Sequence, residues 1–232
     1  MSTLYVVATP IGNLEDITLR ALRVLKEVDL IACEDTRRTK ILLEHYGIQK
    51  PVTSLHEHSG ARKFAELVGR LVTGESLAIV SDAGTPGIND PGGRFIAFFL
   101  EEQTKFGRLA EIPIVPVPGP NAGVTLLSAS GLPADKYLFL GYLPKKKGRQ
   151  TLLGKVALTN LEFRLPIVCY ESPHRLVRTL TDFQKILPEA QIVIGRELTK
   201  KFEEIWRGDL AEAITIWSDR KIQGEFVLVI SF

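Results

Sequence analysis

A long turn rich in glycine and proline is the part of the chain best suited to hold a ligand. It runs from Ser81 to Gly93, between an apolar run at 77–80 that predicts a buried strand and a segment at 94–100 that predicts a helix. Its two prolines and four glycines exclude a helix or a sheet ladder across the turn. Connections of this kind usually take about two to six residues, and this one is about twice as long. Because ligands of open α/β sheets bind at the carboxyl ends of strands, we interpret it as a ligand-binding loop.

Several common kinds of site are excluded because their motifs are missing. The chain has neither a G-x-x-x-x-G-K-[ST] phosphate loop nor a G-x-S-x-G nucleophile turn. The turn at 9–13 contains one glycine only, which argues against a Rossmann dinucleotide site. His56 and His58 would share one face of a strand, but no third ligand follows at metal spacing. We therefore expect a polar loop there and no metal.

Four turns at strand ends could converge on one ligand: residues 9–13, 82–93, 118–122 and 171–175. Each combines backbone made accessible by Gly or Pro with few charged side chains. Such walls suit a ligand held by main-chain hydrogen bonds and apolar contact. Composition and spacing alone do not name that ligand.

Length and composition are typical of a soluble globular protein with one or two domains. The 232 residues are 45% hydrophobic and carry a formal net charge of +2, so a basic site would have to be a local patch. Cys33 and Cys169 lie far apart in apolar segments, which predicts buried free thiols in a reducing compartment. No signal peptide is visible and no apolar run reaches membrane-spanning length. We expect a cytoplasmic protein.

The first half of the chain alternates strand and helix signals. Helices are predicted from a cap at Asp16 to Val28, over 36–46 with Gly47 as the left-handed end, over 61–71 and over 94–100. Strands are predicted at 4–8, 29–33, 52–55, 77–80 and 112–117, the last at a sheet edge because of its prolines. This order is typical of a mostly parallel sheet with helices on both faces.

In the second half the strands follow one another more closely, which predicts a mixed sheet. Strands are expected at 137–142, 166–170, 191–195, 202–207 and 226–230, and helices through Leu132, to about Asn160, over 173–187 and over 210–217. We predict two α/β domains, 1–118 and 119–232, which meet near residues 115–135.

Six segments together resemble one family closely. They are 4–18, Glu34–Arg37, Ser81–Gly92, Pro118–Pro120, Tyr170–Arg175 and Arg196–Lys200. The chain resembles, over nearly its whole length, the ribosomal RNA small-subunit methyltransferase I family of the tetrapyrrole methylase superfamily. The family's longer members carry a further helical segment after the last strand, which the printed sequence does not contain.

The resemblance implies an S-adenosyl-L-methionine-dependent enzyme that methylates the ribose 2′-hydroxyl of a decoding-centre cytidine in 16S rRNA. It further implies two α/β domains of the tetrapyrrole methylase type, a homodimer, and a donor folded into the cleft between the domains. Two alternatives stay open: a tetrapyrrole C-methyltransferase, and a donor-binding ribosome-assembly factor without catalysis. The segments Asp82–Pro86 and Tyr170–Ser172 resemble the RNA branch rather than the corrin or sirohaem branches.

Carried over residue by residue, the resemblance places nine residues against the donor: Ile11, Asp82, Thr85, Pro86, Ile88, Asn121, Ala122, Glu171 and Leu198. The helix start near Asn121 would receive the donor's carboxylate. Removal of the hydroxyl proton calls for a general base. Membership in the motifs makes Glu34, Asp35, Glu171, Glu197 and Lys200 the candidates, each of which could instead form a salt bridge. His174 is expected to be a polar contact at a helix start.

Basic side chains in two segments could contact RNA phosphates. They are Arg37 and Arg38, with Lys40 nearby, and the cluster Lys145, Lys146, Lys147 and Arg149. A solvated turn is the alternative interpretation of the second cluster. A tetrapyrrole also carries carboxylates, so a basic patch does not separate the two methylase hypotheses.

Overall fold

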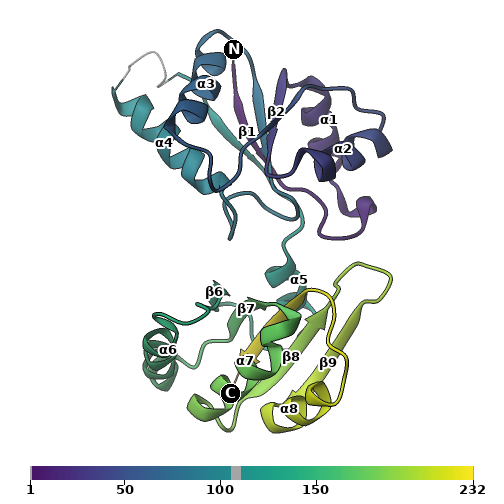
Figure 1. Ribbon diagram of the computed structural model, residues 1–232, viewed down its shortest axis with the longest axis vertical. Coiled ribbons are helices and arrows are strands. Elements are labelled where there is room, and N and C mark those ends of the chain that lie inside the picture. The colour runs from purple at the N-terminus through teal and green to yellow at the C-terminus, as the bar shows by residue number, and fades with distance from the viewer. Residues whose placement is uncertain (1, 106–110, 232) are drawn as a thin grey trace. The chain divides into compact units, whose positions relative to one another are not determined.

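The chain folds into two compact units, each built on its own five-stranded sheet. The computed structural model describes residues 2–105 and 111–231 (Figure 1). Unit 1 comprises Met1–Asn121 and unit 2 comprises Ala122–Phe232. The assignment of functional domains to 1–118 and 119–232 remains a prediction.

Unit 1 contains the sheet that was predicted to be mostly parallel, and all of its strand pairs are parallel. Its strand order is β3-β2-β4-β1-β5. The strands are β1 (Leu4–Val7), β2 (Leu30–Cys33), β3 (Val52–Ser54), β4 (Leu77–Val80) and β5 (Ile114–Val117). The proline-containing strand β5 lies at an edge, where a residue without an N–H does not break a ladder on both sides.

Helices cover both faces of this sheet (Figure 1). They are α1 (Leu19–Glu27), α2 (Thr36–His45), α3 (Ala61–Val72) and α4 (Gly92–Lys105), with a short 3₁₀ helix at Leu14–Asp16. The packing of strand β4 on both faces explains why its sequence is apolar throughout. Leu77 and Ile79 pack with α3 and α4, whereas Ala78 and Val80 pack in the separate cluster under α1 and α2. Two buried faces require an uninterrupted apolar run.

Local sequence signals predicted one helix end of unit 1 correctly and another wrongly. The predicted end at Gly47 is confirmed, because Gly47 has a φ of +62° directly after α2. The predicted cap at Asp16 is wrong. Residues 14–16 form the 3₁₀ helix, and Thr18 caps α1 by accepting a hydrogen bond from the N–H of Ala21 at 3.0 Å. The chain makes one tight turn before the helix begins, which moves the cap two residues along.

Unit 2 contains the predicted mixed sheet, in the order β6-β7-β10-β8-β9. Strands β6 and β7 are parallel, and the other pairs are antiparallel. The strands are β6 (Leu138–Tyr142), β7 (Ile167–Glu171), β8 (Gln191–Arg196), β9 (Glu204–Asp209) and β10 (Phe226–Ser231). Cys169 in β7, like Cys33 in unit 1, is a buried free thiol, as predicted.

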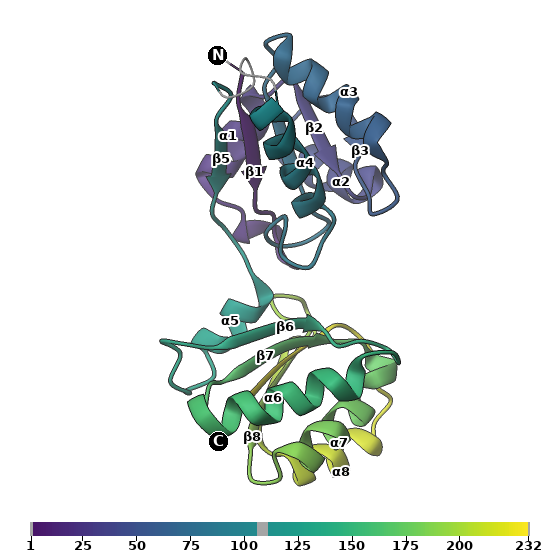
Figure 2. The ribbon, with the colours of Figure 1, turned by 90° about the vertical axis from the view of Figure 1, so that its left-hand side faces the viewer.

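Three helices cover one face of this sheet and a fourth covers the other (Figure 2). The three are α6 (Arg149–Phe163), α7 (Leu176–Ile186), preceded by the 3₁₀ turn Pro173–Arg175, and α8 (Leu210–Ser218). The fourth, α5 (Ala122–Ser128), is shorter than the predicted helix through Leu132. The chain leaves α5 because Ala129 and Ser130 form tight turns onto Leu126 and Leu127, and Gly131 has a φ of +79°.

A buried polar network joins the carboxyl end of β7 to α6 and α7. The Glu171 carboxylate is fully buried and accepts hydrogen bonds from the Ser172 N–H at 2.7 Å and the Thr179 hydroxyl at 2.6 Å. It also pairs with Arg175 at 2.6 Å. Arg149, 1% exposed, donates to Thr179 at 2.8 Å. These bonds satisfy charged groups that would otherwise be costly to bury.

Arg149 also closes this network on its other side. Its Nε donates to Asp182 at 2.8 Å, and its Nη1 donates to the Pro144 carbonyl at 3.2 Å. Arg175 donates in the same way to the Leu143 carbonyl at 2.9 Å. Two anchored guanidinium groups thus fix the backbone at the point where the exposed lysine turn begins.

We predict that Arg149→Ala lowers the free energy of unfolding of unit 2 by about 3–5 kcal/mol, because Asp182, whose side chain is only 11% exposed, would lose its ion-pair partner. Lys147→Ala, an exposed neighbour in the same turn, should change it by less than about 0.5 kcal/mol. Urea denaturation followed by tryptophan fluorescence measures both. Equal midpoints for Arg149→Ala and the wild type would contradict the role given to the network.

Candidate functional site

The parallel sheet of unit 1 brings four turns to one edge. Strands β1, β2, β4 and β5 all point the same way, so the turns after them begin at the same end of the sheet. The turn after β4, which the sequence marked as the ligand loop, follows the central strand. This edge is where ligands bind in open α/β sheets.

Backbone hydrogen bonds fasten the turns after β1 and β4 to each other. Thr9 donates its N–H to the Gly84 carbonyl at 2.9 Å and accepts from the Gly84 N–H at 3.0 Å. The Thr9 hydroxyl donates to the Ser81 carbonyl at 3.2 Å. Gly84 holds a φ of +79°, which favours glycine. The two turns therefore form one fixed wall.

The turn after β5 joins the same wall. The Thr85 hydroxyl donates to the Pro120 carbonyl at 3.1 Å. A Cβ placed on Gly84 would lie 3.4 Å from the Cγ2 of Ile11 and 3.5 Å from the Pro120 oxygen, so these residues are immediate neighbours. A Cβ on Gly119 would lie 2.9 Å from that of Ala8, which explains the glycine there. Of the four turns predicted from the sequence to converge, those at 9–13, 82–93 and 118–122 meet here. The fourth, 171–175, belongs to unit 2.

Asp82 extends the wall to the turn after β2. Its carboxylate accepts a hydrogen bond from the Asp35 N–H at 2.9 Å and lies 3.8 Å from the Arg38 guanidinium. Asp35 in turn caps α2, and its carboxylate accepts from the Arg37 N–H at 2.9 Å. Both oxygens of Asp82 are therefore already engaged within the protein, Oδ1 with the Asp35 N–H and Oδ2 with Arg38.

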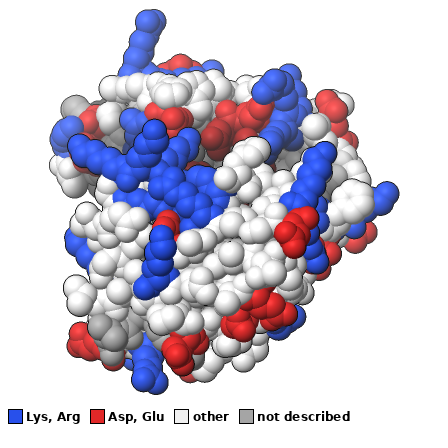
Figure 3. Space-filling view, turned by 60° about the horizontal axis from the view of Figure 1, so that its bottom comes forward, with Lys and Arg blue, Asp and Glu red and all other residues white. Residues whose placement is uncertain are grey.

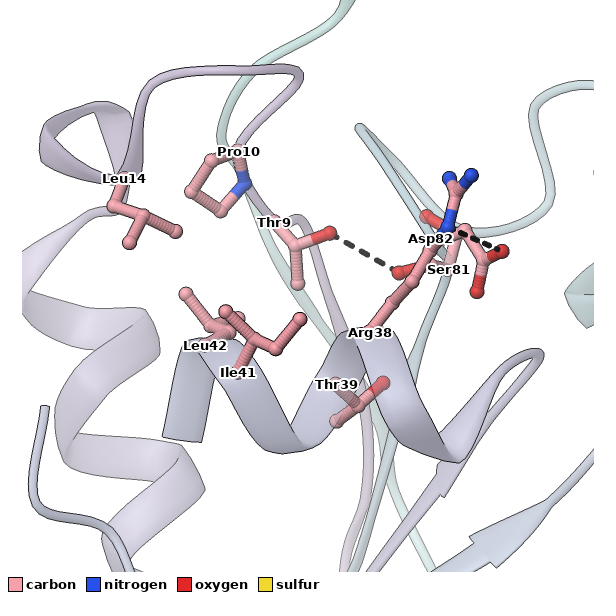
Figure 4. Close-up of a pocket in the computed structure, with 9 residues that line it drawn as sticks. All are labelled: Thr9, Pro10, Leu14, Arg38, Thr39, Ile41, Leu42, Ser81 and Asp82. Carbon is pink, nitrogen blue, oxygen red and sulfur yellow. Dashed lines mark hydrogen bonds and ion pairs between the residues drawn. The ribbon is translucent and has the colours of Figure 1, made fainter. Parts of the chain in front are cut away.

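A small pocket opens beside this wall (Figure 4). Apolar side chains form one part of its lining, and hydroxyl and charged groups form the rest: Pro10, Leu14, Ile41 and Leu42, then Thr9, Thr39, Ser81, Asp82 and Arg38. Its volume is about 130 Å³. Pockets for small molecules are typically about 300–1,000 Å³, so this pocket has room for only a part of a larger ligand.

The long loop itself is held in shape by Asp90. The Asp90 carboxylate accepts hydrogen bonds from the Gly87 N–H at 2.9 Å and the Gly92 N–H at 2.6 Å. Asn89 has a φ of +63°, an unusual conformation outside glycine. Pro86 is buried, whereas Ile88 is 44% exposed and available for apolar contact. The role of Asp90 was missed in the sequence, although an Asp two residues before a glycine is a known turn signal.

The remaining predicted donor contacts lie at or beyond the boundary between the units. Asn121 ends unit 1 and Ala122 opens α5. In unit 2, the Glu171 carboxylate is occupied by the buried network described above. Leu198 is 6% exposed and packs beside Gly195.

The five general-base candidates differ in their electrostatic surroundings. The hydrogen bonds and charge of Arg37 lower the pKa of the Asp35 carboxyl to about 2. Partial burial raises the pKa of the Glu197 carboxyl, but hydrogen bonds from the Glu225 N–H and from Lys200 outweigh burial and lower that pKa. Burial lowers the pKa of the Lys200 ammonium, but its hydrogen bonds to Glu225 and Glu197 and their negative charges outweigh burial, so the pKa is raised. Asp35 and Glu197 are therefore weak bases, and Lys200 stays protonated.

Glu34 has the opposite surroundings. Burial raises the pKa of its carboxyl, repulsion by Asp82, Asp90 and Glu57 adds to the rise, and Arg38 opposes it. No hydrogen bond or ion pair of the Glu34 carboxylate occurs within the described residues. A carboxylate of raised pKa without a fixed donor is the better proton acceptor.

The predicted RNA contacts also differ in exposure. Lys145, Lys146 and Lys147 are exposed on the turn before α6, whereas Arg149 is buried and paired with Asp182. Arg37 is exposed and paired with Asp35 at 2.7 Å, and Arg38 is exposed beside Asp82. Figure 3 shows one face of the molecule on which Lys and Arg side chains gather in a continuous cluster.

The described residues offer neither a cluster of metal ligands nor a helix that could cross a membrane. Within residues 2–105 and 111–231, no group of three or more His, Cys, Asp or Glu side chains could hold a metal ion. Across the same residues, no helix combines the length and apolar character that crossing a membrane requires.

Comparison with known proteins agrees with this geometry. Residues 3–214 match the model of the tetrapyrrole (corrin/porphyrin) methylases. A Thermotoga maritima protein named ribosomal RNA small subunit methyltransferase I is 43% identical over 231 residues, which cover 100% of this chain and 99% of that protein. A protein of the same name from Halalkalibacterium halodurans is 46% identical over 229 residues, which cover 98% of this chain and 75% of its own length.

Solved structures share the fold at much lower identity. The methyltransferase CobJ has a TM-score of 0.72 at 15% identity, covering 100% of this chain and 94% of its own. The uroporphyrin-III C-methyltransferase of Thermus thermophilus, crystallised with S-adenosylhomocysteine, has a TM-score of 0.65 at 18% identity, covering 99% and 97%. The family model over residues 3–214 and the relatives at 43–46% identity show that the chain belongs to the tetrapyrrole methylase family, within its group of ribosomal RNA small subunit methyltransferases I.

Proposed function

We propose that this protein transfers a methyl group from S-adenosyl-L-methionine to the ribose 2′-hydroxyl of a decoding-centre cytidine in 16S rRNA of the small ribosomal subunit. The observation that carries the proposal is identity of 41–46% over nearly the whole chain to proteins named ribosomal RNA small subunit methyltransferase I. The ribose of a decoding-centre cytidine is the target that the resemblance in the motifs implies. Cytoplasmic action is part of the proposal because two buried free thiols suit a reducing compartment, and a homodimer is part of it because the resemblance in the motifs implies one.

The fastened turns of unit 1 fit the donor proposed for them. The donor carries an adenosine with many hydrogen-bonding edges, joined to methylene groups on either side of a positively charged sulfonium. Ile11, Pro86 and Ile88 supply apolar surface, and the turns around Gly84 supply backbone N–H and C=O groups. A crystallised fold relative from Thermus thermophilus binds the demethylated product of such a donor. We include Asp82, Thr85, Asn121, Ala122, Glu171 and Leu198 in the proposed donor site, the last three from unit 2.

The proposed reaction needs alignment and a proton acceptor. The 2′-oxygen attacks the methyl carbon, a C–O bond forms as the C–S bond breaks, and the sulfur leaves as a neutral thioether with the electron pair. Holding the two reactants in line lowers the barrier through the entropy already lost on binding. The hydroxyl proton passes to a base. We propose Glu34 for that base, because its carboxylate alone among the five candidates combines a raised pKa with no fixed donor.

The proposed RNA contacts are the exposed cations of two segments. They are Arg37 and Arg38 on α2 and the lysine turn Lys145–Lys147, all of which reach solvent. Arg149 is left out, because its burial and its pairing with Asp182 keep it from a phosphate. Its proposed part is to hold the backbone from which the lysines extend.

Glu34→Gln should lower the methylation rate by about 100-fold or more, the usual contribution of a general base. In the wild type the rate should fall as pH drops through the raised pKa of Glu34, because the protonated acid accepts no proton. Glu57→Gln removes one of the repulsive charges, so it should move this limb to lower pH without removing it. A wild-type rate for Glu34→Gln, or an unmoved limb in Glu57→Gln, would argue for another base.

The function as a whole is tested with methyl-labelled donor and small ribosomal subunits from cells that lack the modification. We expect label on one ribose of 16S rRNA, mapped by resistance of that position to alkaline cleavage. Label transferred to a tetrapyrrole and not to RNA would favour the C-methyltransferase alternative. Donor binding without any labelled product would favour an assembly factor.

A further inference from the structure

The hairpin loop between β8 and β9, residues 197–203, presents a large aromatic side chain to solvent. Phe202 is 67% exposed. The other apolar residue of the loop, Leu198, is 6% exposed and packs against unit 2 near Leu126 and Gly195. The loop thus buries one apolar side chain and leaves the other outside.

The backbone of this loop is held in a fixed and uncommon conformation. Glu197 has a φ of +49° and Thr199 a φ of +67°, in the left-handed region. The Glu197 carboxylate accepts from the Glu225 N–H at 2.8 Å, and the Glu203 carboxylate accepts from the Thr199 N–H. Two backbone hydrogen bonds of 3.0 Å close the turn. The Lys200 N–H donates to the Glu197 carbonyl, and the Glu203 N–H donates to the Lys200 carbonyl. Residues in such conformations cluster at ligand-binding segments, and a fixed loop loses less entropy on binding.

Three carboxylates around the loop are paired with cations, whereas the printed partner of the Glu203 carboxylate is the Thr199 N–H. Lys200 pairs with Glu197 and Glu225, each at 2.9 Å. Glu204 pairs with Arg220 at 2.6 Å and with Arg196 at 3.4 Å. Lys201, by contrast, forms no ion pair with any described residue, and its ammonium lies 5.7 Å from the centre of the Phe202 ring. An exposed ring therefore stands next to an available positive charge.

We propose that Phe202 is a stacking platform for one unpaired base of the RNA substrate, with Lys201 beside the adjoining phosphate. The inference rests on the proposed RNA methylation. Unpaired bases are bound by stacking on exposed aromatic rings and by cations along the backbone. A protein partner fits this site less well, because a stable interface needs about 800 Å² per partner with an apolar centre, and the neighbours of Phe202 in this loop are charged.

The test compares three variants of Phe202 in the full chain, with unmodified small ribosomal subunits as the probe. Phe202→Ala and Phe202→Leu should both weaken binding by roughly 5- to 150-fold, the range for loss of one stacked base. Phe202→Leu is the matched control, because it keeps apolar area and removes the ring. Phe202→Trp should bind at least as tightly as the wild type, and its added fluorescence should be quenched by the RNA.

A parallel experiment removes the charges of the lysine turn by combining Lys145→Ala, Lys146→Ala and Lys147→Ala. This triple variant should bind the subunits more weakly and with a flatter salt dependence. If this triple variant weakens binding while Phe202→Leu binds like the wild type, the platform is refuted and the proposed function stands. If the wild type neither binds nor methylates the subunits, the proposed function itself fails. A change of oligomeric state in Phe202→Ala with unaltered RNA affinity would assign the ring to contact between copies and overturn the proposal.

Discussion

The reciprocal hydrogen bonds between Thr9 and Gly84 are the constraint on which the candidate site depends. They join the turns after β1 and β4, neighbouring strands at the centre of the parallel sheet. Once these two turns are fixed, Thr85 can reach the Pro120 carbonyl, and Asp82 can hold the N–H of Asp35. One pair of backbone bonds, with the Thr85 hydroxyl and the Asp82 carboxylate beside it, therefore connects four turns.

Different interactions hold the candidate functional segments of the two units in place. Unit 1 relies on backbone bonds and on glycine positions where a side chain would not fit, as at Gly119. Unit 2 relies on buried charge: Glu171, Thr179 and Arg149 form a chain of short hydrogen bonds behind the lysine turn. Breaking a buried charged network is far more costly than losing a surface pair, so such a network holds a segment firmly.

Much of the fold could be predicted because its signals are local. The uninterrupted apolar run of β4 indicated a strand buried on both faces, and the prolines of β5 indicated an edge. The fate of Arg149 could not be predicted in this way. In the sequence it ends a run of lysines and reads as one more solvated cation, but Asp182, its partner, lies 33 positions away. Likewise, nothing near Glu34 in the sequence shows that Asp82, Asp90 and Glu57 surround it.

The central claim is that the fastened turns of unit 1 bind the methyl donor, and calorimetric titration with S-adenosyl-L-methionine tests it most directly. Thr85→Lys places a long charged chain where the hydroxyl now holds Pro120, and Thr73→Lys makes the same change at an exposed residue after α3. We expect no measurable donor binding by Thr85→Lys and wild-type affinity for Thr73→Lys. Wild-type donor affinity in Thr85→Lys would show that these turns do not hold the donor.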